Sequence, residues 1–140
     1  EVLALVRRQG IDADAIGGMT LGADPIGCPA AALSHVEGSP VRAFLVRKEA
    51  KDHGSGRRIE GDLDPASRCV VVDDVITTGG STLRAIEAVE AEGHRVVAVV
   101  CLVDREEGGR EALARFPFYP IFRRSEIFDE KVTESTRGGG

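Results

Sequence analysis

Residues 68–82 read RCVVVDDVITTGGST, and this stretch decides the fold. The apolar residues 69–72 lead into two acids and then into a turn rich in threonine and glycine. Apolar residues that run without polar alternation are typical of a strand in a parallel sheet with helices on both faces. We therefore predict a buried strand over 68–74, a glycine-bearing loop and a helix over 81–92 that ends at Gly93.

The rest of the chain alternates between strand and helix patterns around this stretch. Apolar spacing predicts helices over 1–10, 24–37 and 109–116; Asp24 is expected to cap the second, with Pro25 in its first turn. Strands are expected at 12–18, 41–46, 95–104 and 118–122. This order predicts an α/β fold with a doubly wound parallel sheet. Ligands of such sheets bind at the carboxyl ends of strands, here the loops after Ile16, Val72 and Val103.

The turn after the central strand has the chemistry of a phosphate site. Backbone amides at the start of a helix can converge on one phosphate, helped by the helix dipole and by hydroxyl groups. Asp73 and Asp74 carry the wrong charge for that phosphate, but they suit ribose hydroxyls, either directly or through a magnesium ion. The alternative is a strand end, a helix cap and a tight turn. The patterns GxxxxGK[ST] and GxGxxG are both absent, which disfavours a P-loop or a dinucleotide-binding loop.

A second informative segment is the polar run RKEAKDHGSGRRIE at residues 47–60. It places Arg47, Lys48, Lys51 and His53 in a glycine-hinged loop that is too long for an ordinary turn. Such a flexible lid loop can close on a polyanion, stabilise charge as it develops and exclude water. The alternative is a solvated surface loop, which is how we interpret Arg57 and Arg58.

Composition limits the remaining possibilities. The 140 residues, 42% of them hydrophobic, fit one domain, and we find no internal repeat. A net charge of −5 argues against sequence-independent binding to the phosphates of nucleic acid. No apolar run is long enough for a membrane span and no signal peptide is evident, so we expect a soluble, cytoplasmic protein. The cysteines Cys28, Cys69 and Cys101 are expected to be reduced core thiols.

The stretch from Val70 to Thr82 resembles the signature of the type I phosphoribosyltransferases, and the run at 47–60 resembles the lid of the orotate phosphoribosyltransferases among them. The resemblance implies the type I phosphoribosyltransferase fold and transfer of ribose 5-phosphate from phosphoribosyl pyrophosphate to orotate. The products would be orotidine 5′-monophosphate and pyrophosphate, in the synthesis of pyrimidine nucleotides (UMP). A transferase for another base and a non-catalytic phosphoribosyl-binding regulator remain alternatives, because the fold and the phosphate loop do not fix the acceptor.

The resemblance also implies a set of site residues. The donor would be bound by Arg47, Lys48, Lys51, His53, Asp73, Asp74, Val75, Ile76, Thr77, Thr78, Gly79, Gly80 and Ser81. Orotate would be bound by Thr77 and Arg105, and the catalytic residues would be Lys51, His53, Asp73 and Asp74. The Mg²⁺ cofactor would be held mainly by the substrate, with Asp73 or Asp74 as the candidate protein ligand. Lid residues would act across the interface of a homodimer.

The resemblance covers residues 12–122 and includes the loop GGMTLGADPI at 17–26, which is similar to the pyrophosphate loop of the family. Orotate phosphoribosyltransferases carry a further N-terminal segment that nothing here matches. We therefore expect residues 1–130 to form a phosphoribosyltransferase domain that is N-terminally truncated relative to the family. Residues 131–140 are expected to be a disordered tail.

Overall fold

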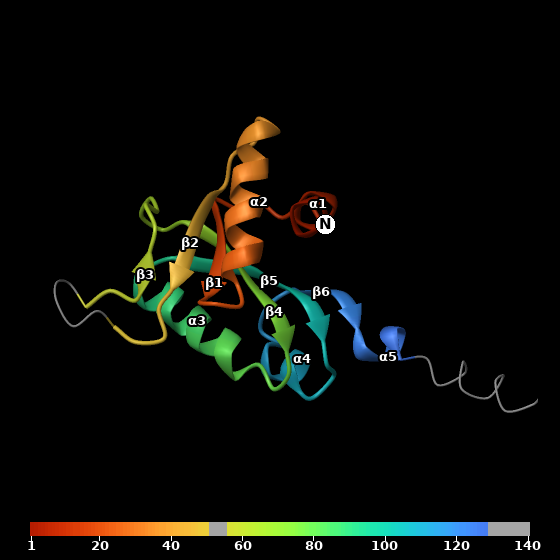
Figure 1. Cartoon of the computed structure of the whole chain (residues 1–140). Coiled ribbons are helices and arrows are strands. Elements are labelled where there is room, and N and C mark those ends of the chain that lie inside the picture. Colours follow the sequence, from red (N-terminus) through yellow and green to blue (C-terminus); the bar gives the residue numbers. More distant parts are fainter. Residues whose placement is uncertain (51–55, 129–140) are drawn as a thin grey trace, which may run out of the picture.

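The computed structural model describes residues 1–50 and 56–128. The sheet has six strands in the order β3-β2-β1-β4-β5-β6 (Figure 1). Its strands are β1 (Ala15–Met19), β2 (Arg42–Val46), β3 (Ile59–Glu60), β4 (Arg68–Ile76), β5 (Arg95–Asp104) and β6 (Phe118–Arg123). Its helices are α1 (Val2–Arg8), α2 (Asp24–Val36), α3 (Gly80–Ala91), α4 (Gly109–Ala112) and α5 (Arg124–Ile127).

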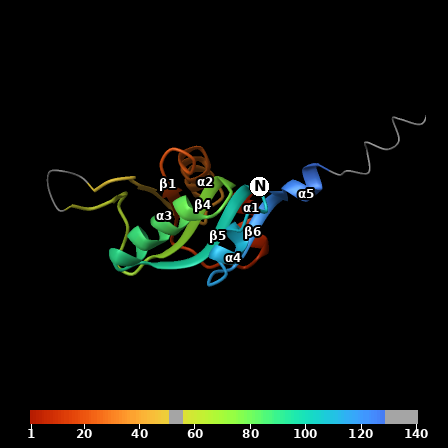
Figure 2. The same cartoon turned by 90° about the horizontal axis from the view of Figure 1, so that it is seen from below.

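Helices cover both faces of the sheet, as predicted, because successive side chains of each strand point to opposite faces. In β4, Val70 and Val72 pack with α1 and α2, whereas Cys69 and Val71 pack on the side of α3 and α4. Figure 2 shows the sheet from below, with α3 and α4 along the near side. All four of these β4 residues are at most 1% exposed. The sheet therefore lies between two hydrophobic cores, one on each of its faces.

The chain reverses its direction of winding between β1 and β4. These two strands pair in parallel, with Ala15 beside Cys69, although β2 and β3 lie between them in the sequence. At the amino end of this pair Arg68 bonds to Asp14, and this hydrogen bond lowers the pKa of Asp14 to about 2. The opposite, carboxyl end of the pair is the switch point, where sheets of this kind bind their ligands.

The described structure corrects several details of the sequence prediction. The strand β3 lies inside the run predicted as a loop, and it pairs antiparallel with β2, so the sheet is parallel except at this edge. Helix α5 was not predicted. Asp24 is not a cap: Ala23 is the N-cap residue of α2, and no side chain caps it, although Pro25 lies in the first turn as expected.

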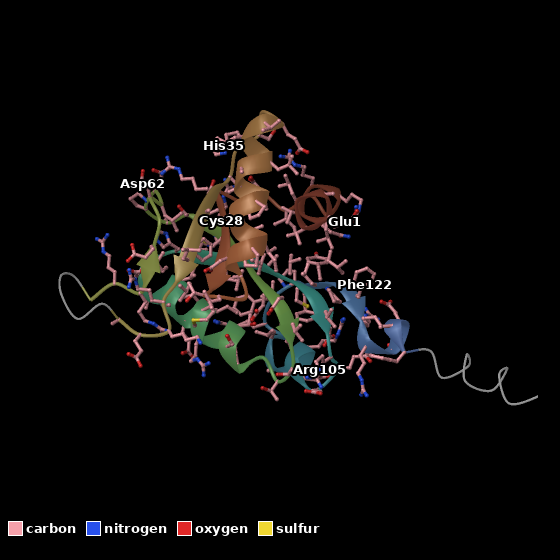
Figure 3. All side chains as sticks on the ribbon, in the orientation of Figure 1. Glu1, Cys28, His35, Asp62, Arg105 and Phe122 are labelled. Carbon is pink, nitrogen blue, oxygen red and sulfur yellow. The ribbon has the colours of Figure 1, made fainter. Side chains whose placement is uncertain are left out.

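The cysteines divide between core and surface. Cys69 and Cys101 are free and buried, and burial raises the pKa of each thiol to about 12. Cys28 is exposed on α2, so its prediction as a core thiol was wrong (Figure 3). The buried face of α2 consists of Gly27, Ala30, Ala31 and Ser34, at helical spacing that excludes position 28. Within the described residues, no helix is long and apolar enough to cross a membrane.

Candidate active site at the carboxyl ends of the strands

The two acids that end β4 lie in different environments. Asp74 is exposed, but Asp73 is only 8% exposed. Asp73 accepts hydrogen bonds from the backbone N–H of Asp74 at 2.9 Å and from the Thr82 hydroxyl at 3.2 Å. Burial, and secondarily the neighbouring Asp74, raise the pKa of Asp73 to about 6. The pair thus combines one exposed carboxylate with one that is held in place.

The loop between β4 and α3 encloses a small cavity. Its volume is about 220 Å³. It is lined by Asp73, Val75, Ile76, Thr77, Thr78, Gly79, Gly80, Ser81, Thr82 and Arg84. Gly79 is the N-cap residue of α3 and has a φ of 89°, a conformation that glycine adopts without strain. The predicted phosphate-loop residues 75–81 therefore surround one hollow at a helix N-terminus, where anions are favoured.

The loop after β1 lies directly against the acid pair. Thr20 donates its backbone N–H to the Val46 carbonyl at 3.0 Å, and the peptide bond between Thr20 and Leu21 is cis. A Cβ at Gly22 would stand 2.7 Å from a carboxylate oxygen of Asp73 and equally close to one of Asp74. Only glycine fits this approach without displacing the acids. The loop begins at Thr20 rather than after Ile16, because β1 runs on to Met19.

Arg105 lies beside the phosphate loop. Its backbone N–H donates to the Ile76 carbonyl at 3.0 Å, and its half-exposed side chain pairs with Glu107 at 3.0 Å. Figure 3 shows Arg105 near α4, at the edge where β4 and β5 end. Gly109 packs against the same loop and donates its N–H to the Thr77 carbonyl at 3.0 Å. Thr77 and Arg105, the residues expected to hold the acceptor, are thus neighbours.

A second contact fixes the loop that carries Arg105. The Glu106 carboxylate accepts hydrogen bonds from Ser125 at the start of α5, from its N–H at 3.1 Å and from its hydroxyl at 2.8 Å. Glu106 itself has a φ of 58°, which is unusual for a residue with a side chain. Sequence reasoning missed both Glu106 and Ser125, since nothing local indicates that residues so far apart in the sequence meet.

The base of the predicted lid is held by Arg58. Its guanidinium donates to the carbonyl of Arg47 at 3.0 and 3.1 Å and to that of Lys48 at 3.1 Å. The Arg47 side chain pairs with Glu60 at 2.8 Å. The interpretation of Arg58 as an ordinary solvated charge was therefore wrong. Lys51 and His53, two of the expected catalytic residues, lie outside the described residues.

The predicted site residues fall into two groups. The acids, the phosphate loop and Arg105 are joined by the contacts described above. Arg47 and Lys48 follow β2, next to the loop after β1, but no ion pair or hydrogen bond between described residues joins their side chains to the phosphate loop. The first group forms one candidate site at the switch point, and Gly22 and Thr82 join it through contacts to the acids that the sequence analysis did not foresee.

The fold, the acid pair and the phosphate loop define the class of protein. Residues 38–132 match the family model described as "Phosphoribosyl transferase domain". The chain is 48% identical over 116 residues to the orotate phosphoribosyltransferase of Aquifex aeolicus, a match that covers 81% of this chain and 63% of that protein. It is 43% identical over 138 residues to the enzyme of that name from Thermococcus gammatolerans, covering 97% of this chain and 70% of that protein.

The chain is also similar in structure to a solved orotate phosphoribosyltransferase. Orotate phosphoribosyltransferase of Mycobacterium tuberculosis in complex with 5-phospho-alpha-D-ribosyl 1-diphosphate superposes with a TM-score of 0.75 at 36% identity, covering 91% of this chain and 74% of that one. The chain belongs to the orotate phosphoribosyltransferase family. It spans less than two thirds of the length of its Aquifex relative.

Proposed function

We propose that this chain carries the catalytic core of an orotate phosphoribosyltransferase, which transfers ribose 5-phosphate from phosphoribosyl pyrophosphate to orotate. The observation that carries the proposal is the acid pair at the end of β4, which leads directly into the cavity of residues 75–81. A phosphate and a ribose are the two adjacent groups that this arrangement suits. The names of the relatives and the complex of the Mycobacterium enzyme with the donor support the choice of substrates.

In this proposal the donor binds across the switch point. Its 5′-phosphate occupies the hollow at the N-terminus of α3, where backbone amides and the hydroxyls of Thr77, Thr78 and Ser81 are available. Its ribose hydroxyls donate to Asp74 and Asp73. Gly22 leaves room for the pyrophosphate beside the acids, since a side chain there would fill that space.

The acceptor binds beside this cavity, on the side of β5, where Arg105 lies next to the phosphate loop. A guanidinium is well suited to a bidentate contact with a planar carboxylate such as that of orotate. Arg105 can supply it, because the Glu107 pairing is half exposed and easily exchanged. Displacement then takes place at the anomeric carbon through an oxocarbenium-like state, with no covalent nucleophile. Positioning, electrostatic stabilisation and exclusion of water supply the rate.

A magnesium ion fits this site only as a companion of the substrate. Among the described residues no group of three or more His, Cys, Asp or Glu side chains could hold a metal. Asp74 is the exposed acid of the two, with one oxygen accepting the Val75 N–H, whereas both oxygens of the buried Asp73 accept hydrogen bonds. We therefore propose Asp74 as the protein's contact to Mg²⁺, whose remaining ligands would be donor oxygens and water. The ion would neutralise the pyrophosphate as it leaves.

The cations of the predicted lid complete the proposal. Arg47, Lys48, Lys51 and His53 would stabilise the departing pyrophosphate, and Arg47, Lys51 and His53 would act on the partner subunit of a homodimer. Arg47 and Lys48 stand at the end of β2, the strand next to β1 and its loop. Arg47 would bind the donor by exchanging its bond to Glu60 for one to pyrophosphate.

Pyrophosphate release from phosphoribosyl pyrophosphate, with orotate, uracil or adenine as acceptor, tests this proposal. We expect pyrophosphate release when orotate is the acceptor and none with uracil or adenine. Release with adenine and not with orotate would establish a transferase for another base. Donor binding, measured by calorimetry on the same sample, separates two outcomes. A chain that binds the donor without turnover with any base would be a phosphoribosyl-binding regulator, whereas a chain that does not bind it would refute the phosphate-loop assignment.

A further inference from the structure

The backbone on both sides of Arg105 is fixed by hydrogen bonds. Arg105 donates its N–H to the Ile76 carbonyl at 3.0 Å, and the next residue, Glu106, donates its N–H to the Asp104 carboxylate at 2.9 Å. Asp104 is the last residue of β5, is only 1% exposed, and lies beside Ile76 in the sheet. The main chain at Arg105 is therefore tied to the end of β4 from which the phosphate loop starts.

Glu106 has a backbone conformation that its residue type disfavours. Its φ of 58° lies in the left-handed region, which glycine adopts without strain and glutamate does not. Such strain persists only where surrounding contacts fix the backbone, and it is concentrated at functional sites. Glycine would be the less strained residue at this position, so the glutamate side chain must supply a compensating contact.

That contact joins Glu106 to Ser125, and we call it the Glu106–Ser125 clasp. One carboxylate oxygen accepts the Ser125 N–H at 3.1 Å, and the other accepts the Ser125 hydroxyl at 2.8 Å. Ser125 lies in α5, where Glu126 accepts the N–H of Arg123, the last residue of β6, at 2.9 Å. The clasp therefore fastens the loop that carries Arg105 to the end of β6 as well as to β4.

The negative charge of Glu106 does not by itself suit an anionic acceptor. Glu106 and Glu107 follow Arg105 directly and are both exposed, so each would repel a carboxylate bound at Arg105. Glu107 contacts the Arg105 guanidinium at 3.0 Å, whereas both oxygens of Glu106 are occupied by Ser125. The two acids therefore differ in what they do to Arg105, although they carry the same charge.

We propose that Glu106 is a positioning residue for the acceptor. Through the Glu106–Ser125 clasp it holds the strained loop in the one conformation that keeps Arg105 beside Thr77 and the phosphate loop. Its effect on the acceptor passes entirely through the Arg105 guanidinium. This inference rests on the proposed function, in which Arg105 binds the carboxylate of orotate.

Orotate binding by the whole chain, measured by calorimetry, tests the inference. Asparagine tolerates the left-handed backbone, but its side chain is one methylene shorter, so Glu106→Asn removes the clasp. It should weaken orotate binding about three- to tenfold, as expected for the loss of one or two hydrogen bonds, and leave binding of phosphoribosyl pyrophosphate unchanged. Glu107→Gln is the matched control, because it removes the same charge one position further on and frees Arg105. It should bind orotate at least as tightly as wild type.

A double-mutant cycle shows whether Glu106 acts through Arg105. In the Arg105→Ala background, Glu106→Asn should have no further effect on orotate binding. A purely structural role would weaken orotate binding by the same factor in both backgrounds, and this outcome would contradict the inference. Tighter orotate binding by both Glu106→Asn and Glu107→Gln would also contradict it, because charge alone would then explain both variants.

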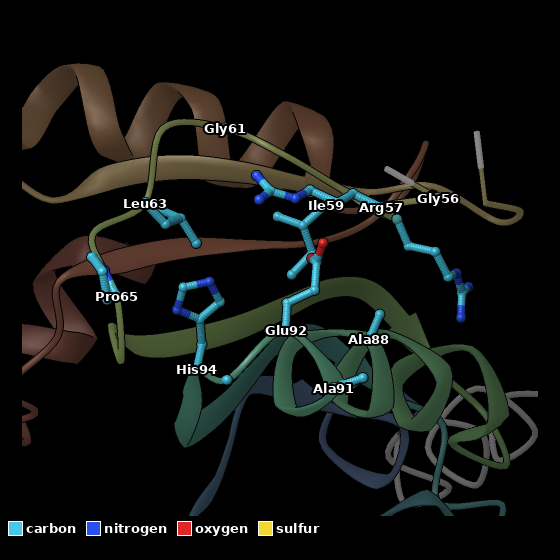
Figure 4. A pocket seen from close by; sticks show the side chains of 12 residues that line it. Gly56, Arg57, Ile59, Gly61, Leu63, Pro65, Ala88, Ala91, Glu92 and His94 are labelled. Atoms are coloured by element: carbon cyan, nitrogen blue, oxygen red, sulfur yellow. The ribbon is translucent and has the colours of Figure 1, made fainter. Parts of the chain in front are cut away.

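NMR spectra report on the clasp independently of ligand binding. The backbone amide signal of Ser125 should move in Glu106→Asn. The ring signals of His94 should not, because His94 lines a separate cavity at the C-terminal end of α3 (Figure 4). An unchanged Ser125 signal, or equal orotate affinity of wild type and Glu106→Asn, would overturn this inference alone. Failure of the wild-type chain to bind orotate would overturn the proposed function and this inference together.

Discussion

Asp73 combines burial with titration, and this makes the stability of the protein depend on pH. Its pKa in the folded protein is about 6, above the ordinary value of 3.8, chiefly because it is buried. The folded state therefore binds the Asp73 proton more tightly than the unfolded state. The contribution of Asp73 to the free energy of unfolding is therefore highest below about pH 4, falls as the pH rises through 6, and is constant above about pH 7.

The neutral variant Asp73→Asn should lack the part of the pH dependence of the free energy of unfolding that Asp73 causes. Between pH 4 and pH 7.5 we expect its free energy of unfolding to rise relative to wild type by at most about 3 kcal/mol, measured by urea denaturation. Asp74→Asn is the matched control, since it leaves the burial of Asp73 intact and should keep most of the decline. Both variants should bind the donor more weakly. Parallel stability curves for wild type and Asp73→Asn would show that Asp73 titrates normally.

Arg105 gives a second prediction about a single residue. Arg105→Ala should weaken orotate binding about 10- to 100-fold, because a charge-assisted hydrogen bond to the acceptor contributes roughly 1.5–3 kcal/mol. Donor binding should change little. Arg105→Lys keeps the charge without the planar pair of donors and should recover only part of the loss. Equal losses for donor and orotate, measured by calorimetry, would mean that Arg105 only supports the loop.

At the scale of secondary-structure elements, Arg58 ties the start of β3 to the end of β2. The backbone N–H of Arg47 donates to the Arg58 carbonyl at 2.7 Å, and the Arg58 guanidinium bonds back to the carbonyls of Arg47 and Lys48. The two strands are thus fastened at the point where the predicted lid leaves and rejoins the sheet.

Arg58→Ala should therefore misplace Arg47 and Lys48 without unfolding the sheet. We expect KM for the donor to rise about five- to thirtyfold, which corresponds to loss of one or two hydrogen bonds of roughly 1 kcal/mol each. Arg57→Ala is the control, because the Arg57 side chain is exposed and makes none of these bonds. If the two variants behave alike in steady-state kinetics, Arg58 has no positioning role.

The elements that could be predicted from the sequence are those with a local signal. Strand β4, its loop and α3 follow from apolar runs and glycines that are contiguous in the chain. Strand β3 could not be predicted, since its two residues become a strand only by pairing with Leu45 and Val46. The approach of Gly22 to the acids also depends on tertiary structure. The exposure of Cys28 could have been read from the spacing of the small residues on α2.

At the scale of the whole molecule, the proposed homodimer predicts complementation between two inactive variants. Lys51→Ala retains the phosphate loop, and Asp74→Asn retains the lid. If lid residues act on the partner, as a two-fold interface would arrange reciprocally, a mixed dimer contains one intact composite site. Mixing the two in equal amounts should recover up to about a quarter of wild-type pyrophosphate release.

The control for this prediction is subunit exchange itself. Mass spectrometry of differently labelled subunits should show mixed dimers in the same samples. A lid that serves its own subunit would leave one defect in each site of every mixed dimer. Mixed dimers without activity would therefore exclude sharing of Lys51, while the assignment of the phosphate loop would stand.

The central position of β1 in the sheet has a consequence for biosynthesis. A ribosome makes β1, α2 and β2 before it makes β4, and β1 and β2 can pair in parallel at that stage. The other edge of β1 must wait for β4, and until then it presents unpaired backbone groups beside the apolar residues Ala15 and Ile16. Nascent chains that stall before Ile76 is made should therefore be prone to aggregation and to capture by chaperones. The acid pair arrives on the same strand that closes this edge, so the proposed donor binding cannot begin before β1 is paired on both sides.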